Sequence, residues 1–375
     1  MSSQFARFSF SLVFLLVAAF PAHGQIVLSQ KSLRDIVVSK ELSPSAYLAF
    51  PALLDLGDEL LVSFKHGKSH SGDRGATLEV LRLDAATGNV KSRATVAKID
   101  DKIMQMGEWV RFPNGDIANY IDAQQSNAPS RIGLRVVRSQ DGGHTFGPVE
   151  RVGSVDGVEY GYAFEAITEG PTTWMLAMTF TNLSSGKSVY PSRPVAGSVD
   201  VIRSDDNGKT WHFVRNLTKE FGDIPINEST FARHGDGFLF SARGYDNRQW
   251  LLETDGSFQL KRKVDLTRDN AFIKSYVGRP RVFARDGRWY LLGRNWTDKG
   301  PMRLSLFRFD PESFVITKHA VLDNSEGENV TDGYYAMPWW RDREGRQIFH
   351  VVTYKGVANR SPDIVQLEFN WEEVR

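Results

Sequence analysis

The sequence predicts an all-β protein, namely a six-bladed β-propeller in which every blade is a four-stranded antiparallel sheet. Two observations carry this prediction: a hairpin-like pattern that recurs about every 58 residues, and a second turn motif that alternates with it. A third supports it, because no stretch of about 12 residues keeps the i, i+3, i+4 apolar spacing of an amphipathic helix.

Six segments resemble β-hairpins, because in each an apolar run leads into a glycine turn and then into an alternating apolar run. PALLDLGDELLVSF around Gly57 and RVFARDGRWYLLGR around Gly287 are examples. Turns such as NG and DG between alternating strands are a strong hairpin signal. The turn glycines lie 58, 55, 67, 50 and 58 residues apart and are Gly57, Gly115, Gly170, Gly237, Gly287 and Gly345.

A second motif, S-x-D-x-G-x-T-aromatic, stands between the hairpins at 139–146 and at 204–211. Weaker versions lie near Asp84, Asp255 and Asp310. In such a turn the Ser, Asp and Thr side chains bond backbone groups, the glycine adopts positive φ, and the aromatic ring packs beneath. The motif therefore predicts a second hairpin in each repeating unit.

Two hairpins per unit give four strands, and six units account for the chain after residue 24. A two-sheet sandwich would also contain many short strands, but its sequence would not repeat at this period. We expect the last strand candidate, 364–369, to pair with the early run 35–38 and so close the ring.

Residues 1–24 are predicted to be a cleavable signal peptide, and residues 25–375 to form a single propeller domain. Arg7 precedes an apolar run, 8–20, that is too short to span a bilayer, and 22–24 end in a small-x-small pattern. The alternative is an N-terminal membrane anchor. We therefore expect a secreted or periplasmic protein without membrane insertion after cleavage.

Composition narrows the class of function. With 46 Lys+Arg against 45 Asp+Glu, the formal charge of +1 gives no electrostatic case for a nucleic-acid partner. The absence of cysteine excludes a disulfide scaffold, a thiolate zinc site and a cysteine nucleophile. The 8 histidines show no metal-ligand pattern, so we expect neither a metal nor a cofactor. We expect a monomer.

The register of the repeat indicates where a site would lie. In a propeller the innermost strand of each blade lines the central channel, and its entry end faces any ligand. That end lies about eight or nine residues before each turn glycine in five units and further back in the last. The residues there are Ala49, Gly107 with Glu108, Tyr162, Glu228, Arg279 and Tyr334. For any one of them, an ordinary loop ion pair is the alternative interpretation.

The two complete turn motifs resemble the Asp-boxes, or BNR repeats, of the sialidase (neuraminidase) superfamily. LAFPALL at 48–54 is similar to that family's F/Y-R-I-P-A-L-L element, with Ala49 in place of the arginine that binds the substrate carboxylate. GYYAM at 333–337 is similar to the A-Y-S-D-L element that carries the nucleophilic tyrosine. The resemblance covers essentially the whole chain after residue 24 and implies a sialidase-like propeller.

The resemblance also implies three catalytic residues. Tyr334 takes the place of the nucleophile, and Glu228, in the stretch Asn227-Glu228-Ser229, takes that of its base. Asp73, in a loop before the strand-like run LEVLR, takes the place of the acid/base. A neutral tyrosine suits a substrate with a carboxylate beside the anomeric carbon, because that charge would repel an Asp or Glu nucleophile.

Four basic residues are the implied substrate-binding groups. Arg243 and Arg303 match two carboxylate-binding arginines, since a guanidinium binds a carboxylate bidentately. Lys68 stands where a further binding arginine usually does, and Arg279 is a candidate to replace the arginine lost at Ala49.

The function implied is that of a secreted exo-acting glycoside hydrolase of the exo-α-sialidase type, which releases a terminal acidic sugar from a glycan or oligosaccharide. Two alternatives stay open. One is a glycan-binding propeller without catalysis, which the loss at Ala49 favours. The other is a propeller polysaccharide lyase acting on uronic-acid glycans, with His66 or His70 beside Tyr334.

Overall fold

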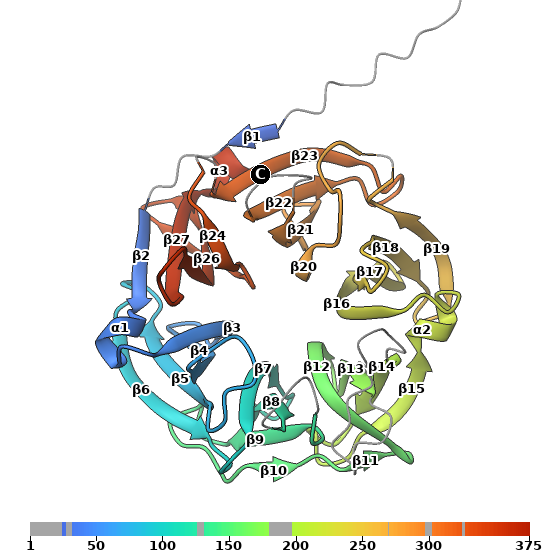
Figure 1. The fold of residues 1–375 in the computed structure, drawn as a ribbon. Coiled ribbons are helices and arrows are strands. Elements are labelled where there is room, and N and C mark those ends of the chain that lie inside the picture. The colour runs from blue at the N-terminus through green and yellow to red at the C-terminus, as the bar shows by residue number, and fades with distance from the viewer. Residues whose placement is uncertain are drawn as a thin grey trace, which may run out of the picture.

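The computed structural model describes residues 25–27, 32–125, 131–179, 197–268, 270–296, 302–324 and 327–375. Six antiparallel sheets stand in a ring around a central axis (Figure 1). The predicted all-β, six-bladed propeller is therefore confirmed. The predicted signal peptide, 1–24, lies outside the described residues.

Blades one to five follow one another along the chain, and each runs from an inner to an outer strand. Their strands are β3 (Tyr47–Asp55), β4 (Glu59–Gly67), β5 (Thr77–Asp84) and β6 (Val90–Ala97); β7 (Ile103–Arg111), β8 (Ile117–Gln124), β9 (Arg135–Ser139) and β10 (Glu150–Arg151); β12 (Val158–Glu169), β13 (Thr172–Thr179), β14 (Val199–Ser204) and β15 (His212–Asn216), with the short β11 (Ser154–Val155) beside β12; β16 (Ile226–His234), β17 (Gly237–Gly244), β18 (Gln249–Thr254) and β19 (Leu260–Asp265); and β20 (Gly278–Arg285), β21 (Arg288–Asn295), β22 (Arg303–Phe309) and β23 (Ile316–Asp323).

Blade six joins the two ends of the described chain. Its inner strand is in two pieces, β24 (Val330–Gly333) and β25 (Met337–Arg343), which both pair with β26 (Arg346–Val357). Next come β27 (Asp363–Asn370) and, outermost, β2 (Ser32–Val37), with Leu33 opposite Leu367. The expected closure of the ring by an early and a late strand is thus confirmed. A further strand, β1 (Gln25–Val27), runs parallel to β23 at the edge of blade five.

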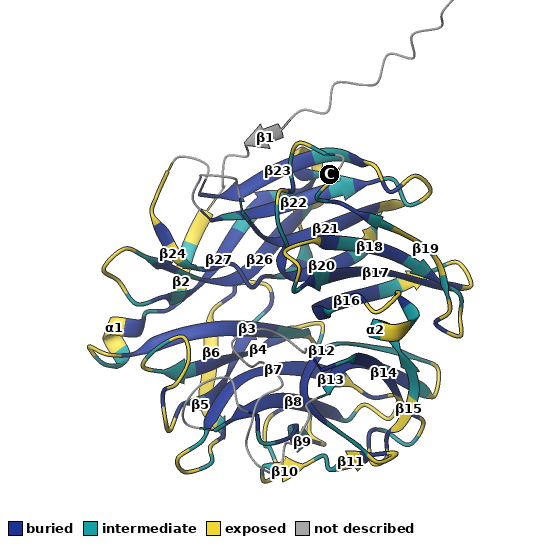
Figure 2. Ribbon diagram, turned by 45° about the vertical axis from the view of Figure 1, so that its right-hand side comes forward, coloured by how far each residue is buried: buried dark blue, intermediate teal, exposed yellow. Residues whose placement is uncertain are grey.

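Burial falls from the second strand of a blade to its outer edge (Figure 2). All eight residues of β8 are buried, because this strand has neighbouring blades on both faces. The outer strand β6 is exposed over its first six residues. Three four-residue helices lie outside the sheets: α1 (Ser39–Leu42), α2 (Leu217–Glu220) and α3 (Trp371–Val374). In the described part of the chain no helix is long and apolar enough to cross a membrane.

The turn between the third and fourth strands is built on an aspartate in each of blades one to five. In the second blade the Asp141 carboxylate accepts from the Thr145 N–H at 2.9 Å, and the Ser139 hydroxyl oxygen accepts from the Gly143 N–H at 2.8 Å. Gly143 has a φ of +79°. The predicted turn geometry is confirmed, and all five turns lie at the opposite end of the blades from the entry end of the inner strands. The turn aspartates are Asp84, Asp141, Asp206, Asp255 and Asp310.

Candidate functional site

Every inner strand breaks its pairing register near its entry end. The breaks lie at Phe50-Pro51, Gln105, Gly161, Asn227-Glu228 and Arg279-Pro280, and in blade six between β24 and β25. A bulge bends a strand and re-aims its side chains. Phe50, Arg279 and Tyr334 have φ values of 57°, 43° and 69° at these breaks. The irregular positions of six blades therefore meet at one end of the ring.

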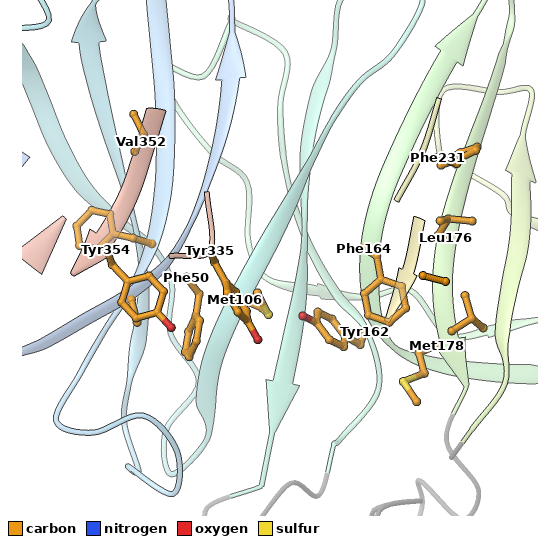
Figure 3. Packing of buried hydrophobic residues seen from close by; sticks show 14 of the residues in the cluster. Phe50, Met106, Tyr162, Phe164, Leu176, Met178, Phe231, Tyr335, Val352 and Tyr354 are labelled. Carbon is orange, nitrogen blue, oxygen red and sulfur yellow. The ribbon is translucent and has the colours of Figure 1, made fainter. Parts of the chain in front are cut away.

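Glu228 is the centre of the polar contacts there. Its Oε1 accepts from the Tyr335 hydroxyl at 2.5 Å and from the Tyr162 hydroxyl at 3.3 Å. Its Oε2 accepts from Arg243 Nη1 at 2.7 Å and from the backbone N–H of Arg279 at 2.9 Å. Figure 3 shows the hydroxyl groups of Tyr162 and Tyr335 turned toward each other from different blades. Residues of blades three, four, five and six thus share one carboxylate.

The surroundings of Glu228 fix its charge. Burial alone would raise the pKa of Glu228, but Arg243, the Tyr335 hydroxyl, Arg279 and Arg294 outweigh it and lower this pKa to about 2. Burial and the negative charge of Glu228 raise the pKa of Tyr335 above its usual value. At neutral pH the pair is therefore a carboxylate that accepts a hydrogen bond from a neutral phenol.

The tyrosine paired with Glu228 is Tyr335, and the expected pairing of Tyr334 with Glu228 is not found. Tyr334 is fully buried, and its hydroxyl donates a hydrogen bond to Asp323 Oδ2 at 2.5 Å. The physical reason is the left-handed backbone of Tyr334 at the interruption of the inner strand, which turns the next residue toward the axis. A shift of one residue exchanges the two faces of a strand.

Two arginines stand at corresponding places beside Glu228. Arg243 and Arg294 are each the last residue but one of the second strand of their blade, β17 and β21. The Arg243 guanidinium lies 3.9 Å from the ring centroid of Tyr276, and that of Arg294 lies 4.9 Å from the ring centroid of Tyr335. Arg294 Nε is buried and has no hydrogen-bond partner among the described residues. The position of the Arg294 side chain also explains why residue 278 is a glycine, because a Cβ at Gly278 would lie 2.7 Å from Arg294 Nε.

Arg294, rather than the expected Arg303, is the arginine that the second strand of blade five brings to this cluster. Arg303 begins β22, the third strand of the blade. There its positive charge, together with burial, lowers the pKa of His319 to about 4, with burial the larger cause. Arg294 could have been found from the sequence by its position, because it stands at the same place in the second strand of its blade as Arg243 does.

Arg279 turns its guanidinium away from Glu228 toward blades two and three. Nη1 donates to the Tyr162 hydroxyl and Nη2 to the Phe164 carbonyl, both at 2.9 Å, and Nη2 also pairs with Glu108. Arg281 binds the same Glu108 at 2.8 Å. The Arg279 side chain is thus engaged with the protein, and only its backbone N–H reaches Glu228.

The position of the lost arginine, Ala49, is fully buried and pairs across the sheet with Lys65. Lys65 Nζ donates to Asp73 Oδ1 at 2.7 Å and to Gln105 Oε1 at 2.8 Å. The other carboxylate oxygen of Asp73 accepts from the backbone N–H groups of Lys68 at 2.8 Å and Ser69 at 3.2 Å.

Asp73 therefore holds the loop that follows β4, and it has contacts on both oxygens. Gly67 belongs to this arrangement, since a Cβ there would lie 2.0 Å from Asp73 Oδ2. The expected binding residue Lys68 has an exposed side chain and takes part through its backbone.

A second polar group lies beside the first and centres on Asp332. Its Oδ2 accepts from His70 Nδ1 at 2.6 Å and from the Tyr47 hydroxyl, and its Oδ1 accepts from the Tyr354 hydroxyl at 2.8 Å. The Phe50 ring lies between the two groups. Its centroid is 5.0 Å from that of the His70 ring and 5.4 Å from that of the Tyr335 ring. Across the described residues, no set of three or more His, Asp or Glu side chains has metal-binding geometry.

The six-bladed propeller is a fold that the chain shares with other proteins of known structure. No protein-family model and no curated protein matches the sequence. Among solved structures, the chain is similar to a Dyadobacter fermentans protein of unknown function, with a TM-score of 0.66 and 14% identity over 91% of this chain and 99% of that chain.

Two sialidase structures are also similar. One is the leech intramolecular trans-sialidase complexed with 2,7-anhydro-Neu5Ac, with a TM-score of 0.60 and 11% identity over 92% of this chain and 71% of that chain. The other is Trypanosoma rangeli sialidase in complex with 2,3-difluorosialic acid, with a TM-score of 0.58 and 10% identity over 90% of this chain and 58% of that chain. The expected resemblance to sialidases is confirmed at the level of the fold.

Proposed function

We propose that the protein is a glycoside hydrolase that removes a terminal acidic sugar from a glycan, with Tyr335 as the nucleophile and Glu228 as its base. The observation that carries this proposal is the 2.5 Å hydrogen bond from the Tyr335 hydroxyl to Glu228, beside Arg243 and Arg294. A phenol is a poor nucleophile until a base takes its proton, and Glu228 is the carboxylate in contact with it.

The arginines supply both substrate binding and a way to switch the base. A substrate carboxylate bound by Arg243 and Arg294 brings a negative charge next to Glu228 and competes for Arg243 Nη1. Both effects raise the proton affinity of Glu228, which is held low in the free protein by the same arginines. The base therefore becomes strong enough to accept the phenol proton once an anionic sugar is bound.

The reaction then proceeds in two displacements. As the Tyr335 oxygen forms a bond to the anomeric carbon, its proton passes to Glu228, and the glycosidic C–O bond breaks as a general acid of the site gives a proton to the leaving oxygen. Water then attacks the same carbon and gives a proton back to that group, the bond to Tyr335 breaks, and Glu228 returns its proton to the phenol. Two displacements at one carbon retain its configuration.

The substrate is an anionic sugar whose carboxylate adjoins the anomeric carbon, because the guanidinium groups flank the hydroxyl that would attack that carbon. A terminal sialic acid meets this requirement, and the fold it shares with sialidases supports testing it first. Residues 1–24 support action outside the cytoplasm, on glycans of the secreted or periplasmic space.

Covalent trapping tests the proposal. The protein is incubated with 2,3-difluorosialic acid, digested, and analysed by mass spectrometry. We expect the added mass on the peptide that contains Tyr335, and we expect it to vanish in Tyr335→Phe. An adduct on a carboxylate would contradict the tyrosine mechanism. Glycan binding without adduct or turnover would instead support the non-catalytic alternative, and an unsaturated uronic-acid product would support the lyase.

A further inference from the structure

His70 is presented on the side of the site opposite Glu228. It lies in the loop that Asp73 holds after β4, and about half of its side chain, 53%, is exposed. Its Nδ1 faces Asp332 at 2.6 Å, and the Tyr47 hydroxyl lies 3.2 Å from the same nitrogen. No described residue bonds Nε2. The imidazole is thus oriented by a carboxylate at one nitrogen and is open at the other.

The orientation of His70 is fixed from several elements. Its backbone carbonyl accepts from Lys65 Nζ at 3.1 Å and from Gln105 Nε2 at 2.7 Å, and its ring packs edge-on against Phe50. Because Phe50 also contacts Tyr335, the histidine and the proposed nucleophile are one aromatic ring apart.

Asp73, the residue that the family resemblance places as acid/base, is engaged in a different way. Its two oxygens accept from the Lys65 ammonium and two backbone N–H groups, and the residue is only 8% exposed. Both oxygens of this carboxylate are therefore bonded to donors of the protein itself. Breaking these hydrogen bonds of Asp73 would also detach the loop that carries His70.

We propose that His70, oriented by Asp332, is the proton donor to the departing glycosidic oxygen. This inference rests on the proposed function. In the first displacement the imidazolium gives its Nε2 proton to the leaving oxygen as the C–O bond breaks and the Tyr335 proton passes to Glu228. In the second, neutral Nε2 takes a proton from the attacking water, which restores the imidazolium as Glu228 returns its proton to Tyr335.

The titratable and charged groups that face the imidazole come from several strands. Asp332 on β24 contacts Nδ1, and Tyr47 on β3 and Tyr354 on β26 share that carboxylate. Burial would raise the pKa of Asp332, but the hydrogen bonds and charge of His70 and the hydroxyl donors lower it, so the partner of His70 is ionised. The cations nearby are Lys65, which is paired with Asp73, and Arg294, 3.9 Å from Asp332.

The test compares leaving groups. The kcat/KM of the full chain is measured for two substrates with the same acidic sugar, one with an activated aryl leaving group and one with a sugar leaving group. An aryloxide departs without a proton, whereas a sugar alkoxide requires one. For His70→Gln we expect a loss of about 100- to 1,000-fold on the sugar leaving group and less than about 10-fold on the aryl one.

His212→Gln is the matched control. It is the same substitution at an exposed histidine on the outer strand β15, whose Nδ1 lies 3.5 Å from Asp156, and we expect neither substrate to be affected. A second measurement is the pH profile on the sugar leaving group. Its alkaline limb, set by loss of the imidazolium proton, should be present in the wild type and absent in His70→Gln.

The outcomes separate the two proposals. A wild type active on both substrates whose His70→Gln variant loses activity equally on both would overturn the role of His70 and leave the hydrolase proposal standing. The same holds if Asp73→Asn, and not His70→Gln, shows the leaving-group dependence. A wild type inactive on every acidic glycoside would overturn the proposed function, and the role of His70 with it.

Discussion

Two groups of buried charges lie next to each other near the propeller axis, and they differ in what their arginines bind. In the first group, Arg279 and Arg281 bond Glu108 and neighbouring acceptors through both terminal nitrogens. In the second, Arg243 uses Nη1 on Glu228, and Arg294 uses Nη1 on the Gly333 carbonyl at 3.4 Å. Among the described residues, the other terminal nitrogens of this second pair have no partner.

The difference teaches how the same residue types serve two purposes. A buried guanidinium whose two terminal nitrogens are both bonded to the protein holds blades together, and those nitrogens have nothing left for a ligand. One with an unused terminal nitrogen, next to a second positive charge, is stabilised by an incoming anion. Proximity to the axis alone would not have separated these roles, because Arg279 contacts Glu228 through its backbone.

The largest expected effect is on Tyr335. Tyr335→Phe removes the proposed nucleophile and should lower kcat on an acidic glycoside by about 10,000-fold or more, equivalent to about 5 kcal/mol of barrier. Steady-state kinetics with a fluorogenic sialoside measure this.

The adjacent Tyr334→Phe is its control. It deletes one buried hydrogen bond to Asp323, so it should cost about 1 kcal/mol of stability and leave kcat within about twofold. Equal kinetic losses at both positions would contradict the assignment of Tyr335.

The next effect is structural. Arg281→Met leaves Glu108 buried with one guanidinium fewer and should lower the free energy of unfolding by about 3–5 kcal/mol, measured by urea denaturation. Arg288→Met, on the same blade but exposed, should change it by less than about 0.5 kcal/mol. A mild effect at Arg281 would mean that the first group does not hold the blades together.

The second group should behave in the opposite manner. Arg294→Met removes a proposed carboxylate donor, so kcat/KM on an acidic glycoside should fall by about 100-fold, or about 3 kcal/mol. The free energy of unfolding should change by less than about 1 kcal/mol, since the only hydrogen bond of this guanidinium to a described residue is the 3.4 Å one to the Gly333 carbonyl. Large unfolding without a selective kinetic loss would erase the distinction between the groups.

The smallest expected effect lies at the opposite end of the blades, in the aspartate turns. Burial would raise the pKa of Asp206, but hydrogen bonds from Thr210 and Ser204 lower it to about 2. A carboxyl with a lowered folded-state pKa stabilises the fold above its unfolded value, near 4, and this contribution is lost as the pH falls toward 2. Asp206→Asn should therefore flatten that acid limb of a Tm-against-pH curve without changing kcat. An acid limb that is the same in Asp206→Asn as in the wild type would contradict this prediction.

The sequence predicted the blades well, because each hairpin combines a glycine turn with alternating apolar residues, and both signals are local. The sequence also predicted that Glu228, Tyr162 and Arg279 lie at the same end of their inner strands, since strand length sets the distance of each residue from the turn. It missed Tyr335 because the interruption after Gly333 reverses which side chain faces the axis. The engagement of Asp73 by Lys65 could not be predicted either, because it depends on the path of a loop without periodicity.

Blade six has a consequence for the order in which the molecule is made. Ser32 pairs with Glu368, so one sheet needs residues from nearly opposite ends of the described chain. During synthesis β2 emerges early and has no partner until β27 leaves the ribosome, while five blades can already pair locally. Closure of the ring is thus the last and most non-local step, and it completes the blade whose inner strand is interrupted at Tyr335. A chain that lacks blade six therefore cannot bring Tyr335 to Glu228.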